Sequence, residues 1–336
     1  MTTAEDYVWY KLFRAEGFGP RSLAILHQTA RDRGVPLAEV FAMDEPTFAS
    51  TFPALGRGRL KRASFRALKE LDEDTLFREY EQLQDSSIAL IHADHEQYPG
   101  RLLRFIDRGV PLILFCRGNV SLLKHGGVAI VGSRDASDEA LQVSRRLAND
   151  LALKDQNVIS GYAKGVDTSA HLGALEADGT TSIVLSSGIL RFSRKKAFNR
   201  FRGHADTLVL SQFAPKAGWS ARNAMIRNRL VCALSRAVIG VESGGERGSD
   251  LRLSGTFNTG KTALDMGIPV FVVSPVSLGS APAGNTELII LGAVEIEPRD
   301  GVEVVLSQLN ADVSDLAQPR ATAEQRSFFD EAEGNG

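Results

Sequence analysis

The sequence predicts an α/β protein: a Rossmann-like, doubly wound and mostly parallel sheet, preceded by a small all-helical N-terminal domain. From about residue 86 onward, short apolar runs alternate with amphipathic helical segments, which is typical of a buried parallel sheet with helices on both faces. Before residue 86, apolar residues recur at helical spacing. The chain has 336 residues, which is enough for two domains.

The helical part is expected over residues 1–85. Glycine pairs at Gly17/Gly19 and Gly56/Gly58 precede helical patterns, as in a helix-hairpin-helix or SAM-like domain, whose backbone amides can contact DNA phosphate. The alternative is that these helical turns simply need glycine.

The sheet part is expected over residues 86–300. Ligands of such folds bind at the carboxyl ends of the strands, so functional side chains should follow each strand. Beyond it, residues 301–336 should hold one short helix over 301–313 and then a polar tail that we expect to be disordered. Eight strands are predicted, within residues 87–93, 111–116, 128–133, 157–161, 181–187, 207–213, 237–242 and 269–275.

Composition indicates an ordinary globular protein, with 43% hydrophobic and 24% charged residues. No apolar run approaches a membrane span, and the N-terminus lacks a signal-peptide pattern, so we expect a cytoplasmic protein with no membrane partner. Cys116 and Cys232 lie in apolar runs, as core residues of a reduced protein would. Six scattered histidines without a C-x-x-C motif argue against structural zinc, so no metal and no cofactor are expected.

The distribution of charge says more than the net charge of −2. Three runs carry several basic residues and no acidic residue, within 56–69, 191–202 and 216–229. One such run can be a solvated helix face, but three in a net-acidic chain favour a polyanionic partner.

The segment Gly255–Thr262 matches the Walker A pattern, G-x-x-x-x-G-K-S/T. In a P-loop, Lys261 would reach the outer phosphates and Thr262 would hold magnesium. That mechanism needs a strand running directly into the loop, and twelve residues separate the apolar run 237–242 from Gly255. No later strand ends in a magnesium-binding aspartate. A nucleotide hydrolase is therefore the minor alternative.

Three strand-to-helix loops combine glycine with serine, arginine or lysine, which suits phosphate groups. The alternative for each loop is a tight turn. None has the spacing G-x-G-x-x-G of a dinucleotide site. The loops hold Gly132, Ser133 and Arg134; Ser160, Gly161, Lys164, Gly165, Asp167 and His171; and Ser254, Gly255 and Thr256.

Five segments occur in an order that resembles the DprA/Smf family of bacterial DNA-processing proteins. They are residues 98–119, 128–134, 160–175, 226–242 and 254–275. The resemblance covers about residues 97–296. It implies a non-enzymatic protein that binds single-stranded DNA, forms a homodimer and loads a RecA-type recombinase during transformation. It also implies that the Walker match is accidental, because the corresponding segment is a loop leading into a helix.

Carried over to this chain, the resemblance makes Gly132-Ser133-Arg134 the phosphate-binding turn. Ser160, Gly161, Lys164 and Gly165 would line the second loop, Ser254, Gly255 and Thr256 would form the third, and Arg227, Asn228 and Arg229 match an Arg-Asn-Arg segment. Some of these arginines, with Asn228, could instead hold neighbouring loops. Asp167 and His171 resemble a helix cap and a packed polar side chain more than an acid/base pair.

The chain also departs from the family pattern. Residues 188–203 replace a usual Tyr-Pro, and the added Arg194, Lys195 and Lys196 should strengthen binding to the DNA backbone. The loop between Glu242 and Ser254 is long and charged, and we expect the chain to lack the C-terminal winged helix that many members carry. These departures leave open a DprA-like component of an anti-phage or mobile-element locus, with a protein partner encoded nearby. A nucleotide-sensing or phosphoribohydrolase-type enzyme is a further alternative, although P-G-G-x-G-T-x-x-E is missing.

Overall fold

The computed structural model describes residues 4–55, 59–201, 206–245 and 254–317, with side chains omitted at 59–63 and 312–317. The polar tail beyond residue 317, the Gly56/Gly58 pair and most of the charged loop before Ser254 lie outside these residues. Among the described residues, no helix has the length and apolar character that a bilayer span needs.

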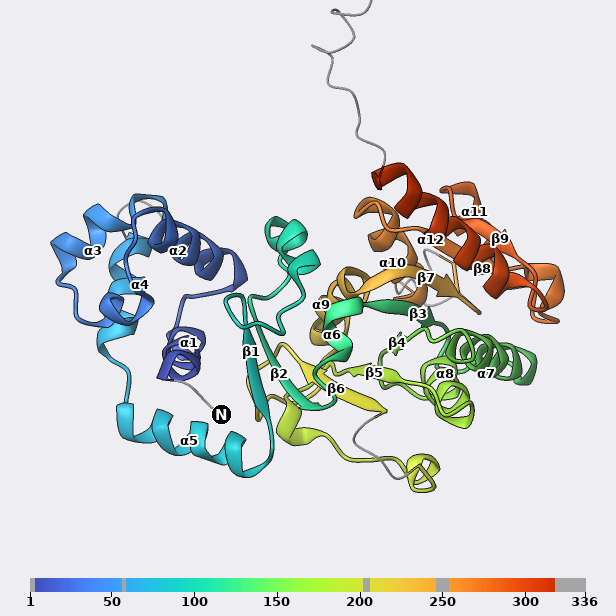
Figure 1. Cartoon of the computed structure of the whole chain (residues 1–336), viewed down its shortest axis with the longest axis horizontal. Helices are drawn as coiled ribbons and strands as arrows, with labels where there is room; N and C mark the ends of the chain where they lie inside the picture. Colours follow the sequence, from blue (N-terminus) through green and yellow to red (C-terminus); the bar gives the residue numbers. More distant parts are fainter. Residues whose placement is uncertain (1–3, 56–58, 202–205, 246–253, 318–336) are drawn as a thin grey trace, which may run out of the picture.

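A nine-stranded sheet forms the centre of the molecule, with strand order β1-β2-β6-β5-β4-β3-β7-β8-β9 (Figure 1). The chain runs outward from β3 through β4, β5 and β6, and then returns to place β7, β8 and β9 on the other side of β3. The α/β fold expected from the sequence is confirmed. The strands are β1 (Ala89–His92), β2 (Ile113–Gly118), β3 (Gly127–Val131), β4 (Val158–Ser160), β5 (Thr181–Val184), β6 (Thr207–Ser211), β7 (Ser235–Gly240), β8 (Val270–Val273) and β9 (Val294–Ile296).

The pairing is parallel from β6 to β9. The other two pairings, β1 with β2 and β2 with β6, are antiparallel. All eight predicted strands are present, and β9 was not predicted. Because β1 runs parallel to β6, its carboxyl end lies at the same edge of the sheet as the carboxyl ends of the parallel strands.

Helices cover both faces of the sheet (Figure 1). On one face, α9, α10 and α11 pack with Leu230, Phe257 and Leu288 against alternate strand residues. On the other face, α7 and α8 pack with residues such as Leu147 and Ala170, and α12 joins them. The helices are α6 (Leu122–His125), α7 (Asp138–Ala152), α8 (Val166–Glu176), α9 (Ala221–Leu234), α10 (Gly255–Asp265), α11 (Ala283–Ile290) and α12 (Gly301–Ala317), and short three-ten helices include η3 (Gly100–Arg108), η4 (Ile189–Arg191), η5 (Lys196–Phe198) and η6 (Pro275–Ser277).

The described residues among the first 85 form five α-helices and two short three-ten helices, at the left in Figure 1. Their apolar side chains, Trp9 and Phe48 among them, form one cluster with Phe115 of β2 and Val209 of β6. The helical region and the sheet therefore share a core. The helices are α1 (Ala4–Arg14), α2 (Pro20–Asp32), α3 (Glu45–Thr51), α4 (Arg59–Lys69) and α5 (Glu73–Asp85).

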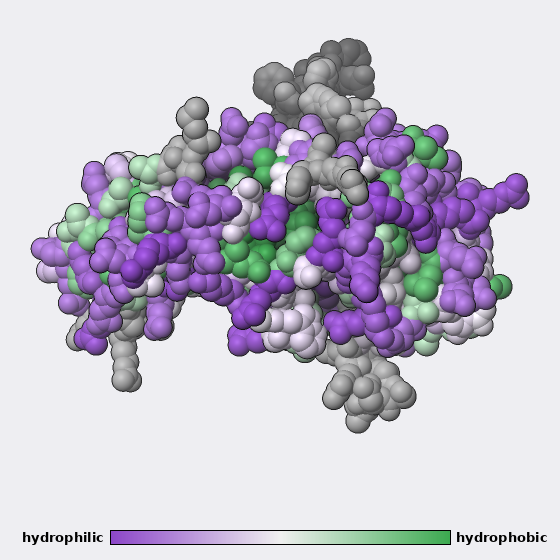
Figure 2. Space-filling view, turned by 90° about the horizontal axis from the view of Figure 1, so that it is seen from below, coloured by the Kyte–Doolittle hydropathy of each residue, from purple (hydrophilic) through white to green (hydrophobic). Residues whose placement is uncertain are grey.

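Hydrophilic residues cover most of the face seen in Figure 2. The apolar residues on that face gather mainly near the middle, between the helical end and the other end of the molecule.

Candidate nucleic-acid interface

The loops after β3 and β4 meet at the carboxyl edge of the sheet. The amide of Val166 donates to the carbonyl of Ser133 over 3.2 Å. Gly165 has a left-handed φ of +80°, and a Cβ there would overlap the backbone of Ser133 and Arg134. Glycine is thus required both by conformation and by close approach. Gly132 fits in the same way against the side chain of Val166. The two loops that the sequence singled out are locked together.

Arg134 is the exposed cation of this junction. Its guanidinium lies 5.6 Å from the ring centre of Trp219, a residue that is 58% exposed. Trp219 comes just before Ser220, whose side chain caps α9 by accepting from the Asn223 amide over 3.0 Å. The sequence analysis missed Trp219. A tryptophan in a loop with glycine and serine neighbours was the available signal, since exposed loop aromatics are often functional.

Lys164 lies beside the same junction. Its ammonium forms an ion pair with Asp135, and both side chains are largely exposed. Such an exposed pair contributes little to stability. A phosphate group could therefore replace Asp135 as the partner of Lys164.

Arg227 differs from Arg134 because it is buried. Its guanidinium donates to the carbonyl of Val184 over 2.9 Å and lies behind Gly161, where a Cβ would overlap it. Burial lowers the pKa of Arg227, while Asp167 acts in the opposite direction. The position of Arg227 favours the structural alternative over phosphate contact.

Asp167 and His171 are also held by structural bonds. Asp167 accepts from the amide of Ala163 over 3.3 Å. His171 is fully buried, with Nε2 2.5 Å from the carbonyl of Gly161 and Nδ1 2.6 Å from the hydroxyl of Thr181. A carbonyl only accepts, so Nε2 carries the proton. The single proton of the Thr181 hydroxyl is shared between Nδ1 of His171 and the carbonyl of Val158, which lies 2.8 Å from that hydroxyl. Burial lowers the pKa of His171 to about 4.

Three further candidates point inward rather than toward a ligand. The Ser160 hydroxyl donates to the carbonyl of Ile130 over 2.6 Å, and Ser160 has no exposed surface. Asn228 donates to the carbonyl of Gly255 over 3.3 Å and so ties α9 to α10. Thr256 is buried within the first turn of α10. The sequence gives the right loops for these residues but does not indicate the direction of their side chains.

The Walker-like segment is helix α10 rather than a phosphate-binding loop. Ser254 caps it by accepting from the amide of Phe257 over 3.3 Å, and Gly255 is its first residue. Gly260 packs against the side chain of Leu288 within the core. The backbone amides that would wrap a phosphate in a P-loop are therefore used in helical hydrogen bonds.

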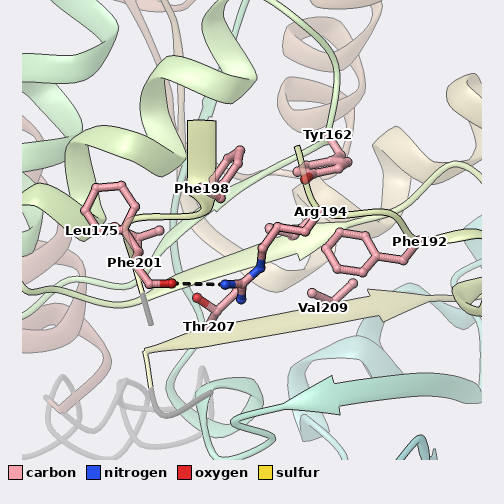
Figure 3. Close-up of a pocket in the computed structure, with 9 residues that line it drawn as sticks. Tyr162, Leu175, Phe192, Arg194, Phe198, Phe201, Thr207 and Val209 are labelled. Atoms are coloured by element: carbon pink, nitrogen blue, oxygen red, sulfur yellow. Dashed lines mark hydrogen bonds between the residues drawn. The ribbon is translucent and has the colours of Figure 1, made fainter. Parts of the chain in front are cut away.

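The basic segment after β5 folds over an aromatic pocket (Figure 3). Arg194 crosses the pocket and donates to the backbone carbonyl of Phe201 over 3.0 Å. Tyr162, Phe192 and Phe198 lie around it. The cavity volume is about 20 Å³, room for one water molecule but not for a nucleobase.

Lys195 also turns inward, where an outward ammonium was expected. Its ammonium donates to the carbonyls of Tyr162 and Ala163, both over 2.9 Å, and to the hydroxyl of Thr168 over 2.8 Å. Burial lowers the pKa of Lys195. Of the three added cations, Arg194 and Lys196 are exposed, and Lys196 lies at the start of η5.

A carboxylate occupies the N-terminus of α7. Glu242 follows β7 and accepts from the Ser137 hydroxyl over 2.7 Å and from the Ser137 amide over 3.3 Å. Ser280 donates to the same carboxylate over 2.8 Å. This place lies between β3 and β7, where the chain reverses direction and Rossmann-like folds bind dinucleotide phosphates. Here the chain's own Glu242 provides the anion.

The structure therefore brings together one part of the predicted set. Gly132, Ser133, Arg134, Lys164 and Gly165 form a single surface with Trp219, which we call the edge platform. Arg229 lies elsewhere, exposed and beside Gly109 after η3. Ser254 and Gly255 lie at the start of α10, next to Asn228.

Comparison with known proteins shows which family the chain resembles. Residues 89–307 match the model of a family described as DNA recombination-mediator protein A. The chain is 33% identical over 230 residues to DNA processing protein DprA of Streptococcus pneumoniae, covering 67% of this chain and 74% of that protein. It is 28% identical over 274 residues to the Bacillus subtilis DprA, covering 79% and 88%. Protein Smf of Escherichia coli is 33% identical over 228 residues, covering 66% and 58%.

Two solved structures resemble the model. The S. pneumoniae DprA matches with a TM-score of 0.70 at 26% identity, covering 89% of this chain and 97% of that one. DNA processing protein A from Helicobacter pylori matches with a TM-score of 0.54 at 25% identity, covering 66% and 96%, and its description concerns a single-stranded DNA binding mode.

Proposed function

This chain belongs to the DNA recombination-mediator protein A family, and from that premise we propose that it binds single-stranded DNA at the edge platform without catalysing a reaction. The H. pylori relative is described as a single-stranded DNA binder. In this chain, Asp167 and His171 are committed to structural hydrogen bonds, which leaves them unsuited to acid/base work.

The observation that carries the proposal is the pairing of Arg134 with Trp219. Proteins that bind single strands combine cations for the phosphates with exposed aromatic rings on which bases stack. Arg134 and Trp219 supply one of each within 5.6 Å, at the strand edge where this fold binds ligands. Lys164 adds a second exposed cation.

We propose in addition that the chain forms a homodimer and delivers the bound strand to a RecA-type recombinase. The family description as a recombination mediator supports the second step. Exposed Ile290, Leu291 and Val294, near the outer edge of the sheet, support the first, because grouped apolar surface marks association sites.

The test is fluorescence anisotropy with a labelled oligo-dT. Loss of one stacked base costs ~1–3 kcal/mol, so Trp219→Ala should weaken binding about 5- to 150-fold. Arg134→Ala should weaken it about 10- to 150-fold, and Arg134→Lys should restore part of the loss because an ammonium cannot bind phosphate bidentately. Affinity should also fall steeply with salt.

Matched controls lie on α5, where Phe77 is 51% exposed and Arg78 is also exposed. Phe77→Ala and Arg78→Ala should leave affinity unchanged. If Trp219→Ala and Arg134→Ala both bound oligo-dT as tightly as the unmodified chain does, at unchanged melting temperature, the edge platform would be refuted as the binding site.

A further inference from the structure

A group of acidic and histidine side chains lies where the helical region meets the sheet, outside the edge platform. We call it the junction cluster, and it consists of Glu5, Asp6, His27, His92 and Asp94. Glu5 and Asp6 belong to α1, His27 belongs to α2, and His92 ends β1. Asp94 follows in the turn after β1. The cluster therefore joins two helices of the N-terminal region to the end strand of the sheet.

Three of these side chains can supply ligand atoms to one cation. One atom each from Glu5, His92 and Asp94 lies within 4.8 Å of the other two. Tetrahedral zinc with bonds of about 2.0–2.1 Å would hold these atoms about 3.3 Å apart. Glu5 is exposed near the start of α1, so rotation of its side chain can bring its carboxylate closer to His92 and Asp94.

The remaining members orient these ligands. Asp6 lies 3.1 Å from Nε2 of His92, which makes Nε2 the protonated nitrogen and leaves the lone pair on Nδ1. The Asp94 amide donates to that Nδ1 over 3.3 Å, so a bound cation would take the place of this hydrogen bond. His27 Nε2 lies 2.9 Å from both oxygens of Asp94. Carboxylate–histidine pairs of this kind are the usual outer support of metal ligands.

The charge of the cluster also suits a divalent cation. Glu5, Asp6 and Asp94 contribute three negative charges, and the largely exposed Arg31, 3.6 Å from Asp94, contributes one positive charge. These four charges sum to −2.

We propose that the junction cluster binds one zinc-type divalent cation through Glu5, His92 and Asp94. Mixed imidazole and carboxylate donors without a thiolate fit Zn²⁺, Co²⁺ or Ni²⁺. The sequence analysis expected no metal because the six histidines are scattered and no C-x-x-C motif occurs. The bound ion would join α1 to the end of β1, and the proposal does not depend on DNA binding.

The test uses Trp9 as a reporter, because its ring stacks on His92 with centres 5.0 Å apart. The full chain with Trp219→Phe has Trp9 as its one tryptophan. When this variant is titrated with Co²⁺, the fluorescence of Trp9 should be quenched saturably at micromolar concentration, with a stoichiometry of one ion per chain. Added Zn²⁺ should displace Co²⁺ and restore the fluorescence. Zn²⁺ alone should raise the melting temperature, since a cation that binds only the folded state stabilises it.

The decisive variant is Glu5→Gln, which removes an exposed ligand without disturbing the core. It should weaken Co²⁺ binding at least tenfold, whereas the matched control Glu16→Gln, at the exposed far end beyond α1, should not change it. Equal quenching in Glu5→Gln and the control, or no saturation at millimolar Co²⁺, would overturn the proposal. A melting temperature that rises at lower pH but not with Zn²⁺ would also overturn the proposal, and it would show that the cluster binds protons instead of a metal ion.

Discussion

Among single residues, His171 determines how stability should depend on pH. Its pKa is about 4 in the folded chain and about 6.5 when exposed. The unfolded state therefore binds the proton more readily between these values. The stability that neutral His171 provides is complete above about pH 6.5 and is lost as pH falls toward 4, by an amount on the order of 3 kcal/mol.

Urea unfolding at pH 7.5, 6 and 5 measures this dependence. His171→Gln should be less stable at pH 7.5 and should lose less of its stability on acidification than the unmodified chain. The matched control is His125→Gln, an exposed histidine, which should keep the full pH dependence. If the free energy of unfolding fell equally with pH in the unmodified chain and in His171→Gln, the buried ring would not titrate as described.

The residue scale is also where prediction from sequence reached its limit. Gly132, Gly165 and Arg134 were expected at the carboxyl edge, and the structure places them there. Lys195 and Arg227 were expected to face phosphate, but both turn inward and donate hydrogen bonds to backbone carbonyls. The local sequence around a basic loop residue does not show whether its side chain turns inward or toward solvent, because the partner carbonyls come from segments more than 25 residues away.

At the scale of elements, helix α10 decides between a nucleotide hydrolase and an accidental motif. Lys261 is an exposed residue of a regular helix, not the end of a phosphate-binding loop. Lys261→Ala should therefore change DNA affinity by less than about twofold, because an exposed helical lysine contributes under ~1 kcal/mol.

A nucleotide-binding measurement can contradict this prediction. Isothermal titration with ATP and magnesium should give the same result for the unmodified chain and for Lys261→Ala. A measurable ATP affinity that disappears in the variant would restore the P-loop interpretation.

The elements themselves were largely predictable. Eight apolar runs became eight strands, because a strand buried on both faces must be apolar throughout. The ninth strand, β9, was missed: it has three residues, and two of them are exposed. The antiparallel direction of β2 was also invisible, because its fully apolar interior resembles that of a parallel strand.

At the scale of the whole molecule, the next prediction concerns dimer formation at the outer edge of the sheet. Ile290 is 79% exposed at the end of α11, near Val294 of the edge strand β9. If this surface forms the proposed homodimer, Ile290→Arg should yield a monomer, because a desolvated charge has no partner there.

Light scattering after size exclusion measures the mass of both forms. Leu153→Arg is the matched control, because Leu153 is 66% exposed at the end of α7 and should tolerate the change without altering the mass. A dimer that survives Ile290→Arg would exclude this surface.

The packing of the helical region against the sheet could not be read from the sequence. Helical spacing predicted helices in this region, but not that Tyr10 and Phe13 of α1 meet Phe115 of β2. Such contacts join segments about 100 residues apart, and local periodicity carries no information about them.

The carboxylate at the start of α7 has a consequence for the physiology of the protein. Cells change their levels of ATP, NADH and related cofactors with growth and starvation. In many Rossmann-like proteins, the crevice that Glu242 fills is where such molecules bind. A chain that closes this crevice with its own side chain should hold DNA equally well in a fed and in a starved cell.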